Sequence, residues 1–215
     1  MIMKKIAIIG AGGFGQEVYC IWRDMLISEG LKYDFVGFFD DNSDVKQNKF
    51  GKVVGSINDL NVVDHEIYVA IAIGNPEIIR KIREKINNPL VKFPNIIHPS
   101  VKFLDKNSLI MGEGNILSLD VLISCNVEIS NFNVFNTRAT LGHDVFVGNF
   151  NVFSPNVQIS GNVTIDDYNF FGFNCGIIQG RKIGISNVIG AGAILLRSIR
   201  DKGTYIGVPA VKMKL

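Results

Sequence analysis

The chain has 215 residues, enough for one large or two small globular domains, and its hydrophobic content of 47% supplies ample material for a core. Charged residues make up 20% and the net charge is +2, which excludes a strongly basic nucleic-acid-binding surface and an acidic disordered tail. Cys20, Cys125 and Cys175 lie far apart with no CxxC pair, so we expect reduced thiols and no metal site.

The first residues do not predict a targeting or membrane segment. The apolar run Ile6–Ile9 stops after four residues at a glycine cluster, which is too short for a signal peptide. No stretch approaches the roughly 20 apolar residues of a membrane-spanning helix. We therefore expect a cytoplasmic protein with no membrane span.

The N-terminal half alternates short apolar strands with helical segments. The pattern predicts strands over 5–9, 35–39 and 67–73, and helices over 15–29 and 76–86, the second with a proline at its start. Strands that alternate with helices build a parallel βαβ sheet. Residues 1–95 are therefore predicted to form a small α/β domain with a Rossmann-like parallel sheet.

From about residue 96 onward the helical signals disappear and an internal repeat replaces them. Every sixth residue from Met111 to Leu195 is apolar, and small or polar residues commonly follow. Such a period indicates a solenoid of short parallel strands, in which the apolar residues stack inside. We attribute the frequent glycines, as in Leu141-Gly142, to corners that need unusual backbone angles.

Together these features resemble the hexapeptide-repeat sugar O- and N-acyltransferases. The array of hexads carries the resemblance together with Gly207-Val208-Pro209-Ala210, the Gly10–Gly15 loop, Phe39-Asp40-Asp41, Ile73-Gly74-Asn75 and Gly142-His143-Asp144. This combination is similar to the bacillosamine and perosamine N-acetyltransferases and to the sialic acid O-acetyltransferases. The resemblance implies that residues 96–215 form an all-β, left-handed parallel β-helix with three hexads in each coil.

The glycine loop by itself has two interpretations. Gly10, Gly12 and Gly15 fit the dinucleotide fingerprint, and Asp40 stands where a dehydrogenase holds the ribose. However, fewer than about 100 residues precede the repeats, which is too few for a full dinucleotide-binding fold. The resemblance implies that this domain instead binds a nucleotide-activated amino sugar.

The substrate contacts implied by the family fall on the glycine loop, the paired acids and the third strand end, namely Gly12, Gly13, Phe14, Asp40, Asp41 and Gly74. Phe14 departs from the family, which usually has a histidine there, so a polar contact of that side chain is lost. A tight turn is the structural alternative for the two glycines, and a solvated loop for the two acids.

Only three histidines are present, and His143 alone lies within the repeats. His65 is expected on the surface and His98 at the junction of the two halves. A base near neutral pKa suits acetyl transfer to an amine, so His143 is the candidate general base, with Asp144 to orient its ring. An ordinary outward polar residue is the structural alternative.

Two further catalytic candidates come from the repeat and the family. Gly161 should stack one coil beyond His143, leave a slot for the thioester and donate its N–H to the oxyanion. The family places an asparagine near the catalytic histidine, which corresponds to Asn136, and a buried asparagine ladder between coils is the structural alternative. Acetyl-CoA contacts carried over from the family are Val152, Phe173 and Ala191.

Three functions stay open on the sequence. The first is acetyl-CoA-dependent N-acetylation of the 4-amino group of a UDP- or dTDP-linked 4-amino-4,6-dideoxy sugar, and the nucleotide-like loop favours it. The second is O-acetylation of a sugar such as a sialic acid, and the third is a non-catalytic β-helical binding protein. The family also implies a homotrimer, and Phe146, Phe150 and Phe170 lie outside the core register.

Overall fold

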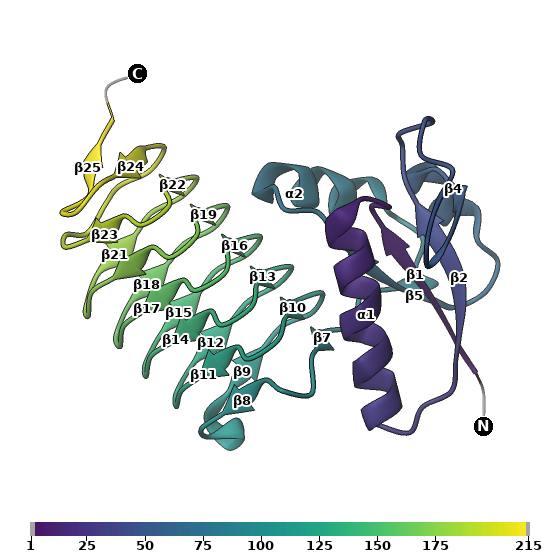
Figure 1. Cartoon of the computed structure of the whole chain (residues 1–215), viewed down its shortest axis with the longest axis horizontal. Coiled ribbons are helices and arrows are strands. Elements are labelled where there is room, and N and C mark those ends of the chain that lie inside the picture. Colours follow the sequence, from purple (N-terminus) through teal and green to yellow (C-terminus); the bar gives the residue numbers. More distant parts are fainter. Residues whose placement is uncertain (1–2, 214–215) are drawn as a thin grey trace. The chain divides into compact units, whose positions relative to one another are not determined.

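A computed structural model describes residues 3–213, and these residues form two compact units that divide after Pro99 (Figure 1). The predicted division fell after residue 95. No helix within residues 3–213 has the length and apolar character that crossing a membrane requires.

The N-terminal unit is a six-stranded sheet with helices, as the alternating pattern predicts. The strand order is β3-β4-β2-β1-β5-β6, and the pairs are parallel except β3 with β4. Its strands are β1 (Lys4–Ile9), β2 (Tyr33–Phe39), β3 (Gln47–Asn48), β4 (Gly51–Gly55), β5 (Ile67–Ile71) and β6 (Val91–Lys92), with β7 (Ile96–Ile97) near the end of the unit. The helices are α1 (Gly13–Ser28), α2 (Pro76–Lys85) and the 3-10 turn η1 (Ile57–Val62).

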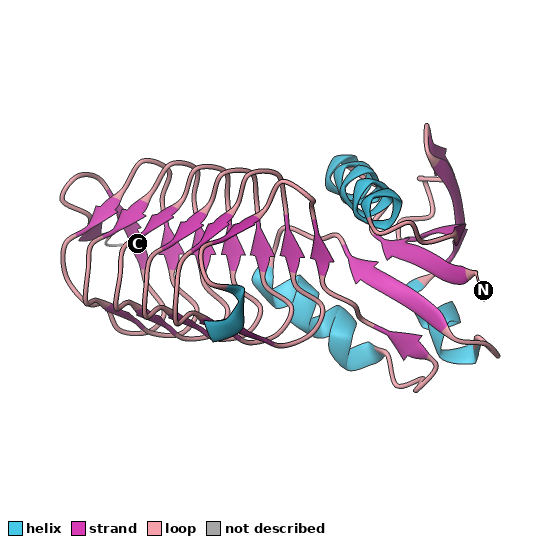
Figure 2. Cartoon of the chain, turned by 90° about the horizontal axis from the view of Figure 1, so that it is seen from below, coloured by secondary structure: helices cyan, strands magenta, loops and turns pink. Residues whose placement is uncertain are grey.

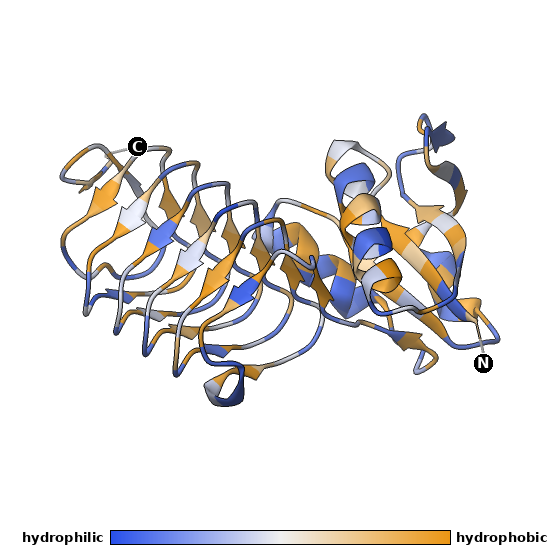
Figure 3. Ribbon diagram, turned by 60° about the horizontal axis from the view of Figure 1, so that its bottom comes forward, coloured by the Kyte–Doolittle hydropathy of each residue, from blue (hydrophilic) through white to orange (hydrophobic). Residues whose placement is uncertain are grey.

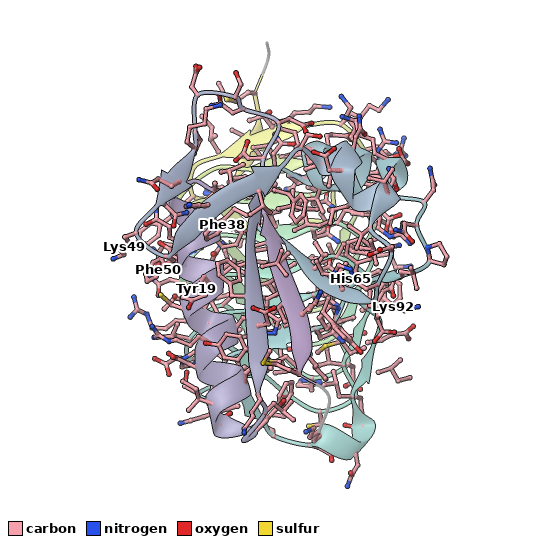
Figure 4. All side chains as sticks on the ribbon, turned by 90° about the vertical axis from the view of Figure 1, so that its right-hand side faces the viewer. Tyr19, Phe38, Lys49, Phe50, His65 and Lys92 are labelled. Atoms are coloured by element: carbon pink, nitrogen blue, oxygen red, sulfur yellow. The ribbon has the colours of Figure 1, made fainter. Side chains whose placement is uncertain are left out.

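The hydrophobic centre of this unit follows from its central strands. All four residues from Ile6 to Ile9 are buried, and in Figure 3 the strands of the sheet are mostly coloured as hydrophobic. On one side an aromatic cluster covers the sheet, in which the Tyr19 ring lies 4.9 Å from that of Phe50 and 4.6 Å from that of Phe35 (Figure 4). Such offset and tilted contacts anchor α1 to the strands.

The C-terminal unit is a β-helix whose short strands stack into three flat faces, as the hexad repeat predicts. It is left-handed, as the family resemblance implies. Figure 2 shows the strands of successive coils lying side by side. Face 1 has the order β25-β24-β22-β19-β16-β13-β10, face 2 the order β23-β20-β17-β14-β11-β8, and face 3 the order β21-β18-β15-β12-β9. We name each corner by the two faces that it joins.

Between residues 110 and 195 the strands of each face recur every eighteen residues. Face 1 contains β10 (Ile116–Leu117), β13 (Val134–Phe135), β16 (Val152–Phe153), β19 (Phe170–Phe171), β22 (Val188–Ile189), β24 (Thr204–Ile206) and β25 (Val211–Lys212). Face 2 contains β8 (Lys102–Phe103), β11 (Leu122–Ile123), β14 (Thr140–Leu141), β17 (Gln158–Ile159), β20 (Gly176–Ile177) and β23 (Ile194–Leu195). Face 3 contains β9 (Ile110–Met111), β12 (Glu128–Ile129), β15 (Phe146–Val147), β18 (Thr164–Ile165) and β21 (Lys182–Ile183), and the 3-10 turn η2 (Lys106–Ser108) precedes it.

The second residue of each strand fills the interior. Of the apolar hexad positions from Met111 to Leu195, all but Met111 are buried. Phe135, Phe153 and Phe171 stack in adjacent coils with ring centroids 4.6 Å apart. Identical registers therefore place like side chains against each other and build one continuous core.

The glycines at the corners are not explained by unusual backbone angles, contrary to what the sequence suggested. Gly142, Gly148, Gly172, Gly184 and Gly190 do not adopt positive φ; a Cβ on Gly142 would lie 2.6 Å from the backbone N of Gly161 in the next coil. Close approach of the neighbouring coil, and not an unusual φ, requires these glycines.

Left-handed backbone does recur every six residues, but two residues after those glycines and at side chains of many kinds. Asp120, Asn126, Phe132, Arg138, Asp144, Phe150, Asn156, Asn162, Tyr168 and Asn174 all have φ between 55° and 63°. Their N–H groups point to the coil below; that of Asp144 donates to the Cys125 carbonyl at 3.0 Å. This inter-coil hydrogen bond offsets a conformation that side chains other than Asn and Asp seldom adopt.

A ladder of buried asparagines, which does not include Asn136, fills the corner that joins face 3 to face 1. The ladder consists of the buried asparagines Asn115, Asn133, Asn151, Asn169 and Asn187. The side-chain oxygen of each of the first four accepts from both the backbone N–H and the side-chain amide of the next asparagine, and that of Asn187 accepts the Gly203 N–H. The bonds to the backbone N–H groups of the asparagines measure 2.8–2.9 Å. Each side chain therefore satisfies polar groups of two coils in a place that water does not reach.

We predict that Asn151→Ala lowers the free energy of unfolding by about 2–4 kcal/mol, because it leaves the buried Asn169 N–H without its acceptor. Denaturant unfolding followed by circular dichroism measures this. Asn107→Ala, in the exposed turn η2, is the control and should change stability little. Equal stabilities of the two variants would contradict the role of the ladder.

Candidate functional site

Two glycines of the N-terminal loop are required by the fold. The loop joins β1 to α1, and Gly10 has a φ of +98°, with its absent Cβ only 2.8 Å from the Ala72 carbonyl oxygen. A Cβ on Gly15 would overlap the Gly10 carbonyl. Packing of the first helix turn against the strands therefore accounts for both residues.

Packing does not account for Gly12, Gly13 and Gly74. A Cβ on any of them would meet no atom within 4 Å, and none of the three has a positive φ. Gly12 is also the N-cap of α1, and no side chain caps that end of the helix. The start of α1 therefore presents backbone N–H groups behind open space, an arrangement suited to an anion.

The first of the paired acids holds this loop in place. The Asp40 carboxylate accepts the Ala11 N–H at 2.8 Å through Oδ2 and the Asn42 N–H at 2.9 Å through Oδ1. Asn48 donates its side-chain amide to the Ala11 carbonyl at 3.1 Å. Both backbone groups of Ala11 are thus fixed by side chains, and Asn48, in a short hairpin with no sequence signature, was not predicted.

The second acid borders a cavity of about 290 Å³ at the carboxyl ends of β1, β2 and β5. Asp41 accepts the Ile57 N–H at 2.9 Å, and its other oxygen lies 3.6 Å from Lys85 Nζ. The wall is apolar within and charged at the rim, and consists of Ile9, Gly10, Asp40, Asp41, Ile57, Ile73, Ile78, Lys81, Ile82 and Lys85. Ligands of open α/β sheets bind at this edge.

The structure thus brings only two of the six predicted substrate contacts into this wall. Among the described residues, the wall contains Asp40 and Asp41 but not Gly12, Gly13, Phe14 or Gly74. Phe14 is half-buried in the first turn of α1. The glycines stand at the open end of the loop, so they fit a part of the ligand that lies outside the cavity.

In the C-terminal unit, His143 and Asp144 form a pair at the corner between faces 2 and 3. His143 Nδ1 lies 2.7 Å from Asp144 Oδ2, and the two side chains are 54% and 50% exposed. Adjacent strand residues normally point to opposite sides. Here the φ of +56° at Asp144 turns the chain, which allows neighbouring residues to meet.

The hydrogen bonds of the pair also affect the charge of Asp144. The hydrogen bond from His143, followed by one from Asn126, lowers the pKa of the Asp144 carboxyl below its ordinary value. The carboxylate therefore stays charged at neutral pH and can only accept a hydrogen bond, so Nδ1 of His143 must carry the proton and donate it. In the neutral imidazole this leaves the lone pair on Nε2, the nitrogen suited to act as a base.

Gly161 stacks on His143, but its absent side chain has a different use from the one predicted. A Cβ on Gly161 would contact Nε2 of the imidazole and lie 2.6 Å from its Cε1 and 2.8 Å from its Cδ2. The ring of His143 therefore occupies the space that was expected to hold a thioester. The residue with positive φ at this corner is Asn162, so strain does not require the glycine.

The remaining predicted residues lie on face 1 and at its corner with face 2. Asn136 donates its amide to the Phe153 carbonyl at 2.9 Å and does not belong to the buried ladder. Phe173 is 54% exposed and stacks one coil before Ala191, whereas Val152 is buried in β16. Within one chain these residues stand at a different corner from His143.

The other histidines do not join the site in the repeats. His65 pairs with Asp64 at 2.9 Å on the surface of the N-terminal unit, where Figure 4 labels it. His98 is 14% exposed, and its Nε2 lies 3.8 Å from Asp24. Within residues 3–213, His, Cys, Asp and Glu side chains nowhere gather in a group of three or more that could hold a metal ion.

Both parts of the chain are similar to known proteins. Residues 5–86 match the family model of the PglD N-terminal domain. The acetyltransferase domain of PglB from Neisseria gonorrhoeae FA1090 is 29% identical, with a TM-score of 0.87 over 98% of this chain and 100% of that one.

Two further structures match over the whole length. PerB from Caulobacter crescentus, in complex with CoA and GDP-perosamine, is 26% identical, with a TM-score of 0.82 over 99% of each chain. WeeI from Acinetobacter baumannii AYE is 25% identical, with a TM-score of 0.86 over 99% of this chain and 100% of that one. These matches confirm the predicted fold and the resemblance to hexapeptide-repeat sugar acyltransferases, and the chain is an acetyltransferase.

We predict that Gly161→Ala lowers the rate of acetyl transfer by about 100-fold or more, because the new methyl group displaces the imidazole of His143. The half-exposed ring swings into solvent, so the melting temperature should change little. Gly180→Asn is the control, since Gly180 has a φ of +72° and open space around it. A fully active Gly161→Ala enzyme would contradict the placement of the ring.

Proposed function

We propose that this chain transfers the acetyl group of acetyl-CoA to the 4-amino group of a nucleotide-linked 4-amino-4,6-dideoxy sugar, with His143 as general base. The observation that carries the proposal is the His143–Asp144 pair, whose Nε2 faces away from the carboxylate and borders Gly161. Two similar proteins support the substrates: the Neisseria domain has been solved with acetyl coenzyme A, and PerB with CoA and GDP-perosamine.

The chemistry needs a proton to move from the amine to the departing thiol. The neutral amine attacks the thioester carbonyl, a C–N bond forms and His143 Nε2 takes the surplus proton of the nitrogen. The C–S bond then breaks, and the imidazolium returns the proton to the CoA sulfur. The Asp144 carboxylate stabilises the imidazolium between these steps, and the Gly161 N–H is the proposed donor to the carbonyl oxygen.

The N-terminal unit is proposed to bind the nucleotide part of the acceptor. The N–H groups at the start of α1, next to Gly12 and Gly13, suit the phosphates. The apolar cavity bordered by Asp41 and Lys85 has a wall suited to the flat faces of a base. Asp40 acts here by fixing Ala11 of the loop. Phe14 brings no polar group to the ligand.

Assay of the pure protein with acetyl-CoA and a panel of UDP-, dTDP- and GDP-linked 4-amino sugars tests the proposal. We expect release of CoA thiol and a product that is about 42 Da heavier than the acceptor, because an acetyl group replaces one hydrogen of the amine. Sugars with a hydroxyl in place of the 4-amino group are the control. Transfer to the hydroxyl sugars and not to the amines would overturn the choice of acceptor.

We further propose that the reaction takes place in the cytoplasm. Cys20, Cys125 and Cys175 are all free thiols in the structure, as suits a reducing compartment. Burial raises the pKa of the Cys175 thiol to about 12, so this cysteine serves packing and not chemistry.

A homotrimer would complete the site. Asn136, Phe173 and Ala191 stand at the corner of faces 1 and 2, whereas His143 stands at the corner of faces 2 and 3. Residues at different corners of one prism meet where a corner of one copy faces the other corner of its neighbour. Of the three phenylalanines expected to be covered by a neighbour, Phe150 already stacks between Phe132 and Tyr168 of its own chain.

Light scattering should therefore give three times the 23.7 kDa of one chain. Mixing an inactive His143→Ala protein with an inactive Asn136→Ala protein should partly restore activity after subunit exchange, because some sites then receive both intact residues. A fully active monomer would contradict the proposed trimer.

We predict that His143→Ala lowers kcat by roughly 100- to 10,000-fold, the usual contribution of a general base, with little change in acetyl-CoA affinity. Asp144→Ala should cost less. His65→Ala is the matched control, because the partly exposed His65 also pairs with a neighbouring carboxylate, that of Asp64, at 2.9 Å. Near-normal turnover of the His143 variant at neutral pH would place the base elsewhere.

A further inference from the structure

Three polar residues spaced eighteen apart form a column that ends at Asp144 of the His143–Asp144 pair. Ser108, Asn126 and Asp144 occupy successive coils at the corner between faces 2 and 3. The Asn126 amide donates to Asp144 Oδ1 at 3.0 Å, and the Asn126 backbone N–H donates to the Ser108 hydroxyl at 2.8 Å. The same hydroxyl donates to the Asp105 carbonyl at 3.2 Å, which fixes its direction.

This column engages the oxygen of Asp144 that His143 does not use. Oδ2 pairs with His143 Nδ1 at 2.7 Å, while Oδ1 accepts from Asn126. A half-exposed carboxylate that is held at one oxygen rotates about its last bond and exchanges partners with water. With both oxygens held, the plane of the carboxylate is set, and with it the direction of the imidazole.

We propose that Asn126 is a positioning residue of the acetyl-transfer site, which holds Asp144 so that His143 keeps Nδ1 protonated and presents Nε2 to the substrate amine. Asn126 does not touch the reacting atoms and acts through Asp144. The Ser108 hydroxyl fixes the backbone from which the amide projects. The inference rests on the proposed role of His143 as general base.

Two observations support a role beyond backbone conformation. Asn126 has a φ of +55°, and asparagine suits this region, so conformation alone could account for the residue type. However, the amide donates a hydrogen bond to Asp144, the charged partner of the proposed general base, and this bond contributes to the lowered pKa of the Asp144 carboxyl. Left-handed conformation requires neither contact, as Phe132 and Arg138 show at the same position of other coils.

The decisive variants are Asn126→Gly, which removes the amide and accepts the positive φ, and Asn126→Asp, which keeps the shape and replaces the donor with a second carboxylate. Asp120→Gly is the matched control. Asp120 has a φ of +56°, is exposed, and its N–H donates to the Ser100 hydroxyl at 2.9 Å, as that of Asn126 does to Ser108. It belongs to a different corner from Asp144.

Steady-state kinetics with acetyl-CoA and an amino-sugar acceptor should separate positioning from folding. We expect kcat to fall about 3- to 10-fold in Asn126→Gly with KM unchanged, since an exposed hydrogen bond to a charge contributes modestly. Asn126→Asp should lose more, because two carboxylates then face each other. Asp120→Gly should keep both constants even where its melting temperature falls as far as that of Asn126→Gly.

Carbon NMR of the Asp144 carboxyl gives a readout that does not depend on activity. Its titration midpoint should lie below that of an ordinary aspartate in the wild type and rise in Asn126→Gly, because a donor to the charged form has been removed. The Asp120→Gly control should leave the midpoint where it is in the wild type.

Two results would overturn the inference, and they are distinguishable. If Asn126→Gly matches the wild type in kcat and in the Asp144 midpoint while His143→Ala is inactive, only the role of Asn126 fails. If His143→Ala itself stays active, the proposed general base fails and the positioning role fails with it.

Discussion

The stacking of coils eighteen residues apart is the constraint on which the C-terminal unit depends. From β9 to β23 each strand pairs in parallel with the strand eighteen residues away along the chain, as Leu141 does with Ile159. Each corner therefore repeats the same geometry, and a residue contacts the residues eighteen positions before and after it in the chain. Polar side chains use this geometry in the buried asparagine ladder and in the exposed column of Ser108, Asn126 and Asp144.

The two columns differ in solvent access, and this separates stability from function. In the ladder, Asn151 satisfies groups of two coils without water, so its loss leaves buried polar atoms unpaired. At the corner of His143 the side chains are half exposed and reachable by a ligand. The same repeat thus supplies a rigid interior and a fixed frame for a pair of residues that needs a fixed direction.

Periodicity predicts the β-helix because the core residue of each hexad is apolar without exception from Met111 to Leu195. It does not predict which corner residue adopts left-handed backbone, since Phe132 and Arg138 do so as well as Asn126. Nor does the presence of Gly161 in the sequence reveal its use, because the contact with the ring of His143 depends on the side-chain rotamer in the folded protein. The Asn115–Asn187 ladder had a readable signal, an asparagine at every eighteenth residue. Asn48 had none, because its contact with Ala11 depends on how a short hairpin folds over the loop.

A crystal structure of the protein with CoA and an acetylated nucleotide amino sugar tests the central claim most directly. The account predicts the amide nitrogen of the product about 2.6–3.2 Å from Nε2 of His143, or joined to it through one water, with Nδ1 on Asp144. It also predicts the nucleotide at the Gly12–Gly13 loop. A product amide far from every copy of His143 would contradict the assignment of the general base and, with it, the proposed reaction.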